Sequence, residues 1–89
     1  MKEWHIKFSK KGFKQLSELD KPIQQLIRAW IRKHLTSTDD PRLFGKPLTG
    51  SLKGLWRYRI GDYRLVCEIH DYVLIIVIIG VGHRKDIYK

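Results

Sequence analysis

Three arginines stand close together in a segment that predicts a β-hairpin. The segment Leu55–Ile69 (LWRYRIGDYRLVCEI) is rich in aromatic and β-branched residues on both sides of Gly61–Asp62. Gly followed by another residue favours a two-residue type II′ turn, because glycine adopts a positive φ at the first turn position without strain. That turn places Arg59 opposite Arg64, with Arg57 two residues along on the same side.

The predicted hairpin therefore gathers three cations on one face. A like-charge pair directly across two strands destabilises a sheet by up to about 1 kcal/mol. The cluster is explained if a phosphate binds over it, since arginine binds phosphate through a bidentate fork. The arginines could instead lie on a solvated face or pair with Glu68, Asp62 or Asp71. Charge counting alone leaves both interpretations open.

The opposite face of the hairpin is apolar and is predicted to enter the core. Its members are Trp56, Tyr58, Ile60, Tyr63, Leu65, Cys67 and Ile69. The predicted register pairs Ile60 with Tyr63, Arg59 with Arg64, Tyr58 with Leu65, Arg57 with Val66 and Trp56 with Cys67.

The elements that must position this hairpin begin with a short strand at Trp4–Phe8 and two helices. Ser9 is a suitable N-cap for a helix that ends near Leu19. Asp20 is a suitable N-cap for a second helix, with Pro22 in its first turn. Apolar residues of the second helix recur at helical spacing and form a wide stripe: Ile23, Leu26, Ile27, Trp30, Ile31 and Leu35.

The remaining segments complete the predicted architecture. Residues 36–51 are rich in Pro and Gly and predict a long loop. Val73–Val81 (VLIIVIIGV) is typical of a strand covered on both faces, and Gly82–Lys89 forms a basic tail. The order β-α-α-β-β-β predicts an α+β fold, with a two-helix hairpin on one face of a small, mainly antiparallel sheet. The arginine face is then expected to turn away from the helices and stay open.

Composition predicts one small domain, residues 1–89, with an acidic partner. The chain carries a formal net charge of +9, which favours nucleic acid, an acidic protein or an anionic membrane surface as partner. Cys67 is the only cysteine, and the histidines show no metal-ligand spacing, so neither a metal nor a cofactor is expected. No signal peptide and no apolar run long enough for a membrane helix is present, which favours the cytoplasm over a membrane.

Two blocks of the sequence resemble the RelE toxins of bacterial toxin–antitoxin modules, within the wider RelE/ParE superfamily. The first runs from Pro47–Gly50 (PLTG) into the hairpin, and the second is the ending Gly82–Tyr88 (GHRKDIY). The resemblance covers nearly the whole chain in element order and length. It implies a RelE-like fold and a ribosome-dependent endoribonuclease that cuts mRNA in the A site and is silenced by a cognate antitoxin.

The resemblance also implies the residues of the site. Basic residues before the turn match Arg57 and Arg59, an arginine after the turn matches Arg64, and an arginine after the last strand matches Arg84. A tyrosine near the C-terminus matches Tyr88. The implied reaction is attack of the ribose 2′-OH on the adjacent phosphate, with the arginines stabilising the transition state.

One departure from the family concerns proton transfer. Members often have lysine at the positions of Arg57 and Arg59, and arginine does not lose its proton in a protein. Proton transfer would then fall to Tyr88, His83 or Glu68, of which histidine is the type that titrates nearest neutrality. Simpler interpretations stay open: a rim histidine, a carboxylate that neutralises Arg64, and a tyrosine packed on the sheet.

Further basic residues are candidates for RNA contacts, namely Arg28, Arg32 and Lys33 on the second helix and Lys85 in the tail. A solvated helix face explains the first three equally well. Two other functions also stay open: a ParE-like toxin that poisons DNA gyrase without cutting RNA, and a catalytically weak module that binds RNA or antitoxin. In every case we expect an acidic, amphipathic antitoxin segment, bound in a groove or as an added strand.

Overall fold

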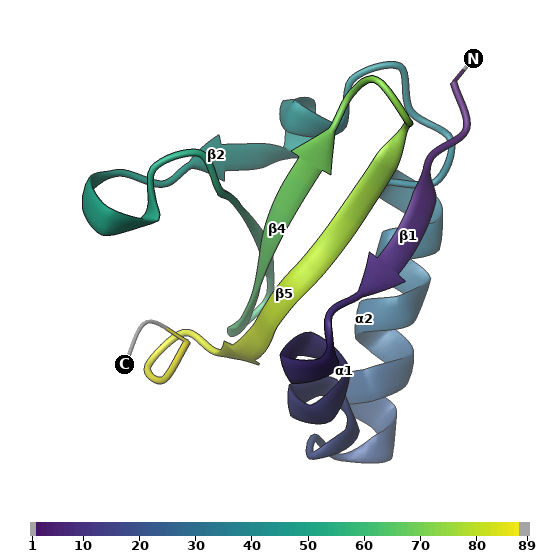
Figure 1. The fold of residues 1–89 in the computed structure, drawn as a ribbon. Helices are drawn as coiled ribbons and strands as arrows, with labels where there is room; N and C mark the ends of the chain where they lie inside the picture. Colours follow the sequence, from purple (N-terminus) through teal and green to yellow (C-terminus); the bar gives the residue numbers. More distant parts are fainter. Residues whose placement is uncertain (1, 88–89) are drawn as a thin grey trace.

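The computed structural model describes residues 2–87, which form two helices and a five-stranded mixed sheet (Figure 1). The strands are β1 (His5–Phe8), β2 (Gly45–Pro47), β3 (Trp56–Ile60), β4 (Tyr63–His70) and β5 (Ile75–His83). The helices are α1 (Lys10–Ser17) and α2 (Lys21–His34), and two short 3-10 turns, η1 (Pro41–Phe44) and η2 (Gly50–Leu52), flank β2. The predicted α+β fold is confirmed, with one strand more than expected.

The strand order is β1-β5-β4-β3-β2, and only the β1–β5 pair is parallel. Figure 1 shows α1 and α2 together on one side of β5, while the loop after β2 and the C-terminal turn lie on the other. Within residues 2–87 no helix has the length and apolar character that crossing a membrane requires.

The hairpin of β3 and β4 has the predicted turn and register. Gly61 has a φ of 59°, whereas Asp62 has no positive φ, as a type II′ turn requires. All five predicted pairs are present, from Ile60 with Tyr63 to Trp56 with Cys67. The positions of Arg57, Arg59 and Arg64 on a common face therefore follow from the turn.

The predictions for two segments, residues 36–51 and the last strand, are wrong. The loop over residues 36–51 contains β2, which is too short to show an alternating pattern. The last strand begins at Ile75, because residues 71–74 form a turn in which Leu74 has a φ of 53°. It extends to His83, which pairs with Tyr63. The strand end therefore lies closer to the hairpin turn than the sequence indicated.

Helix α1 covers the edge of β5 beyond the end of β1. The Ser9 side chain caps the helix and accepts from the Gly12 N–H at 3.0 Å. A Cβ on Gly12 would lie 2.3 Å from the Ile78 carbonyl oxygen, so only glycine permits this approach. Gln15 Oε1 then accepts from the Val81 N–H at 2.9 Å. The second predicted cap, Asp20, occupies the N-cap position but its side chain makes no capping bond.

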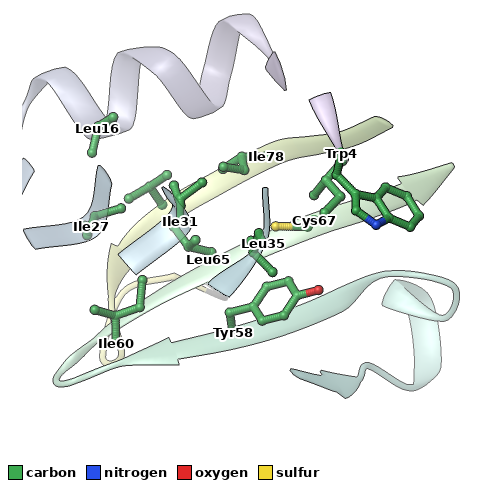
Figure 2. Packing of buried hydrophobic residues seen from close by; sticks show 12 residues of the cluster. Trp4, Leu16, Ile27, Ile31, Leu35, Tyr58, Ile60, Leu65, Cys67 and Ile78 are labelled. Atoms are coloured by element: carbon green, nitrogen blue, oxygen red, sulfur yellow. The ribbon is translucent and has the colours of Figure 1, made fainter. Parts of the chain in front are cut away.

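The core lies between α2 and the helix-facing side of the sheet (Figure 2). Ile27 and Ile31 of α2, together with Leu35 at its C-cap, meet the apolar face of the hairpin, including Leu65 and Cys67. Most of the predicted stripe is confirmed; its exception is Leu26, which is 52% exposed. Trp4 is buried, Trp30 packs against the core, and Trp56 is half-buried.

Candidate functional site

Arg64 is buried against the β3–β4 turn. Its side chain is 8% exposed, and Nη1 donates to the carbonyl oxygens of Gly61 at 2.8 Å and Tyr63 at 2.9 Å. Its cross-strand neighbour on the far side is Gly82, over which Ile87 of the C-terminal turn packs. The expectation that the arginine face is open is therefore wrong at Arg64, because its guanidinium folds back onto the backbone.

Arg84 reaches the same turn from the end of β5. Its backbone N–H donates to the Asp62 carbonyl oxygen at 2.8 Å, and Nε lies 3.8 Å from Asp62 Oδ1. The Arg84 side chain is 55% exposed, so its guanidinium faces solvent. The structure thus brings together two of the predicted site residues, one buried and one exposed, around the two turn residues.

The exposed part of the arginine face lies on β3 and β2. Arg59 stands opposite Arg64, and Arg57 stands opposite Lys46 of β2. Among residues 2–87, no ion pair reaches Lys46, Arg57 or Arg59. Lys46 was missed because its strand was predicted as a loop; Pro47, a residue tolerated on an edge strand, was the available signal. Lys46, Arg57, Arg59 and Phe44 line a hollow of about 240 Å³.

A bidentate ion pair and a buried hydroxyl hold the η1 turn, and with it the start of β2. Arg42 donates from both terminal nitrogens to the Asp71 carboxylate at 2.9 and 2.8 Å, and this pair holds the pKa of Asp71 below its ordinary value. The Tyr58 hydroxyl donates to the Pro41 carbonyl oxygen, and burial raises the pKa of that hydroxyl far above its ordinary value. These contacts fix the segment that carries Phe44 and Lys46.

His83 is the proton-transfer candidate that lies nearest the arginines. It pairs with Tyr63 across β4 and β5, and the two rings meet edge to face at 5.6 Å. Its Nδ1 accepts the Lys85 N–H at 3.2 Å, which assigns the proton of the neutral ring to Nε2. In this neutral form the ring offers a hydrogen-bond donor at Nε2 and no free lone pair that could act as a base.

The other candidates are placed differently. Glu68 lies four residues along β4 from Arg64, about 13 Å at the rise of a strand, and contacts His70 at 3.3 Å. Lys85 is exposed in the C-terminal turn. Tyr88 lies outside the described residues. Within residues 2–87, no three His, Cys, Asp or Glu side chains are placed to hold a metal ion.

The basic residues of α2 belong to a second surface, on the helix side of the sheet. The Arg28 guanidinium lies over the Phe8 ring at 5.5 Å. Arg28 and Arg32 line a hollow of about 200 Å³ between α2 and β1, whose other lining residues are Ile6, Phe8, Ile31 and Thr36. The structure therefore does not bring Arg28, Arg32 and Lys33 together with the arginines of the hairpin.

Comparison with known proteins decides the family. Residues 6–88 match the family model described as the ParE toxin of type II toxin–antitoxin systems, parDE. The chain belongs to this toxin family. Over 97% of its length the toxin is 30% identical to a putative RelE-like toxin protein of Escherichia coli, 90% of which is covered. A 50-residue stretch is 44% identical to the toxin RelG of Mycobacterium tuberculosis, covering 56% of this toxin and 58% of RelG.

A solved structure of the same class shares the fold. The toxin superimposes on a chain of the toxin–antitoxin complex RelBE2 from Mycobacterium tuberculosis with a TM-score of 0.86, at 30% identity and 97% coverage of each chain. The predicted resemblance to RelE toxins is therefore confirmed, and the protein is a toxin of a RelBE/ParE-type module.

Proposed function

We propose that this toxin, as a single domain of residues 1–89, is an endoribonuclease that cleaves mRNA in the ribosomal A site. The observation that carries the proposal is the meeting of Arg64 and Arg84 at one turn, beside Arg59 on the neighbouring strand. Arg59 and Arg84 are exposed, and a guanidinium that faces solvent is free to form the bidentate contact with a phosphate. The proposed target is cytoplasmic.

In the proposed reaction the ribose 2′-oxygen bonds to the adjacent phosphorus, and the bond from phosphorus to the 5′-oxygen breaks. The products are a 2′,3′-cyclic phosphate and a free 5′-hydroxyl. Negative charge grows on the phosphoryl oxygens, where Arg57, Arg59 and Arg84 stabilise it. Arg64, which is buried against the turn, contributes its positive charge without facing solvent, and its hydrogen bonds hold the backbone of the turn.

Two protons move in this reaction. The protonated form of His83 donates one from Nε2 to the departing 5′-oxygen; because that form also carries a proton on Nδ1, the contact with the Lys85 N–H must open when the ring is protonated. The 2′-OH proton goes to Tyr88, since the arginines keep theirs and Glu68 lies about 13 Å along β4 from Arg64. Because residues 2–87 place no complete acid–base pair beside Arg64 and Arg84, we expect the toxin to rely on the ribosome to position the RNA. We therefore expect cleavage of translated mRNA and little or none of naked RNA.

The test is an in vitro reaction with purified components. The toxin is incubated with mRNA bound to ribosomes whose A site is empty, and in parallel with the same mRNA alone. The proposal expects cleavage only on the ribosome, with a 5′-hydroxyl on the downstream fragment. Equal cleavage of both samples, or cleavage of neither, would overturn it.

A gyrase-directed toxin is the second candidate, and the match to the ParE family model favours it. Such a toxin would stabilise gyrase–DNA cleavage complexes and leave mRNA intact. Incubating the toxin with gyrase and supercoiled plasmid tests it: accumulation of linear DNA, together with intact ribosome-bound mRNA, would put this function first.

We further propose that the partner is an acidic antitoxin, in line with the antitoxin present in the RelBE2 complex. The free edge of β1 supports an added strand. The N–H groups of His5 and Ser9 donate to β5, so the backbone groups of Ile6 and Phe8 face away from the sheet, with no backbone partner within residues 2–87. The opposite edge is different, because Pro47 has no N–H to offer.

The hollow beside β1 fits the side chains of such a strand. Ile6, Phe8 and Ile31 offer apolar contacts, while Arg28 and Arg32 offer partners for carboxylates. Hydrogen exchange on the complex tests this: the amides of Ile6 and Phe8 should become protected on antitoxin binding. Unchanged exchange at the amides of Ile6 and Phe8 would exclude strand addition. If ribosomal RNA protects these amides and the antitoxin does not, Arg28, Arg32 and Lys33 would be assigned to RNA binding.

A further inference from the structure

The hollow between β2 and β3 combines an aromatic ring with three cations. Phe44 is 44% exposed, and it lines the hollow together with Lys46, Arg57 and Arg59. Its ring is supported from behind by His34, at 4.9 Å between ring centroids. A large apolar side chain exposed beside cations is positioned to contact a ligand that is both flat and anionic.

The cations of this hollow repel one another, and within residues 2–87 no acidic side chain neutralises them. Lys46 lies directly opposite Arg57, and Arg59 lies opposite Arg64, so two like-charge pairs stand side by side on one face. Like charges in directly opposed positions destabilise a sheet. Lys46, Arg57 and Arg59 have no acidic partner within residues 2–87. A bound anion would relieve this repulsion.

The hollow is also preformed. Gly45 brings β2 close to β3, since a Cβ at this position would lie 2.9 Å from Tyr58 Cε1 and 3.1 Å from the Arg57 carbonyl oxygen. The Arg42–Asp71 ion pair and the Tyr58–Pro41 hydrogen bond hold the preceding turn. The backbone that carries Phe44 and Lys46 is therefore held in place without a ligand, which lowers the entropy that binding must overcome.

We propose that this hollow binds one nucleotide of the RNA strand, with the base stacked on Phe44 and the phosphate held by Lys46. The inference rests on the proposed nuclease function. Strand β3 leads from the hollow to the Gly61–Asp62 turn, with Arg59 between them, so the bound nucleotide flanks the one cleaved beside Arg64 and Arg84. Phe44 and Lys46 then position the strand and contribute to its sequence preference.

The chemistry favours RNA over an acidic peptide. Arginine and lysine bind phosphate and carboxylate alike, but a flat base offers the face that an exposed phenyl ring stacks against. Stacking of this kind tolerates several bases, so the preference it gives depends on stacking strength. An acidic peptide would leave the Phe44 ring without a matching surface unless an aromatic residue accompanied its carboxylates.

The test measures binding of 2′-O-methyl pentaadenylate, which resists cleavage by 2′-OH attack, as a function of salt. Phe44→Leu should weaken binding at least fivefold with an unchanged salt slope, and Phe44→Trp should restore it. Lys46→Gln should lower the slope of log affinity against log salt by about 0.7, the value for one phosphate contact in a single strand. Phe13→Leu and Lys10→Gln, both exposed positions on α1, are matched controls that should bind as the parent does.

Binding by Phe44→Leu that equals binding by Phe13→Leu would overturn the inference, as would a parent that binds no pentanucleotide. Heptaglutamate is tested as a competitor of the pentanucleotide. If its binding depends on Phe44 as strongly as binding of the pentanucleotide does, the hollow is a protein-docking site and the inference is overturned. The ribosome assay separates the two proposals. Binding that depends on Phe44 without cleavage refutes only the nuclease function, whereas cleavage with Phe44-independent binding refutes only this inference.

Discussion

The two arginines that meet at the β3–β4 turn are expected to differ in what they contribute to stability. In Arg64→Ala the charged donor to the Gly61 and Tyr63 carbonyl oxygens is lost at a site that is 8% exposed. A hydrogen bond to a charged group contributes about 1.5–3 kcal/mol, and two that share one nitrogen contribute about 2–4 kcal/mol together. Relief of the repulsion between Arg59 and Arg64 returns up to about 1 kcal/mol.

The net expectation for Arg64→Ala is therefore a loss of about 1–4 kcal/mol in the free energy of unfolding. Arg84→Ala removes only a contact of 3.8 Å between side chains that are 55% and 70% exposed, so its cost stays below about 1 kcal/mol. Both variants should lose cleavage on the ribosome, because both remove positive charge from the phosphate site.

Urea denaturation followed by circular dichroism measures the first quantity, and the ribosome assay measures the second at a temperature where each variant is folded. Arg64→Lys is the matched control, since it retains the charge but not the forked geometry. An Arg64→Ala variant as stable as the parent would refute the structural role of this residue. Full cleavage by folded Arg84→Ala would refute the phosphate-binding role of the turn.

Three further outcomes are expected. Gly12→Ala should destabilise the toxin by about 1–3 kcal/mol in urea, because the new Cβ would lie 2.3 Å from the Ile78 carbonyl oxygen; an unchanged midpoint would contradict this packing. Asp71→Asn should lower the melting temperature at pH 7. Because pairing with Arg42 lowers the pKa of Asp71, the difference should begin to shrink as the pH falls below about 4 and should vanish only below the lowered pKa; a constant difference would argue against the ion pair. The Cys67 thiol, whose pKa burial raises, should react with iodoacetamide only after unfolding, so labelling of the native toxin would contradict its burial.

The hairpin and the second helix could be predicted from sequence because local chemistry determines them. A Gly-first turn sets the pairing of five residue pairs without any reference to the rest of the chain. The apolar spacing of α2 likewise identifies the residues that meet the sheet, including Ile27, Ile31 and Leu35. Leu26 is the exception, since it lies at the margin of the stripe and the helix turns it to solvent.

The position of β2 and the burial of Arg64 depend on contacts between distant segments. Gly45–Pro47 becomes a strand only because β3 offers an edge for it to pair with. Arg64 folds onto the turn beside Gly82 and Ile87, which lie far along the chain and reach it through the pairing of β4 with β5. Pro47 is compatible with an edge strand but does not identify one, and the Arg64 contact has no local signal, so Lys46 was missed and the arginine face was predicted to be more open than it is.

The catalytic set was predicted mainly by resemblance, and the structure adds geometry to it. Arg57 and Arg59 lie on a common face through strand alternation, which the sequence predicts directly. The approach of Arg84 to the turn depends on where β5 ends, and that boundary was predicted two residues too early, because Gly82 and His83 pair with Arg64 and Tyr63 of β4. Assignment of the His83 proton required the Lys85 N–H, a contact without a sequence pattern.

The measurement that tests the central claim most directly is a map of mRNA 5′ ends in bacteria that briefly express the toxin, beside cells that express Arg84→Ala. Arg84 is chosen because its side chain is exposed and its loss should leave the fold intact. The account predicts new 5′ ends within translated codons for the toxin and none for the variant. Growth arrest without new ends, or the same ends in the variant, would contradict it.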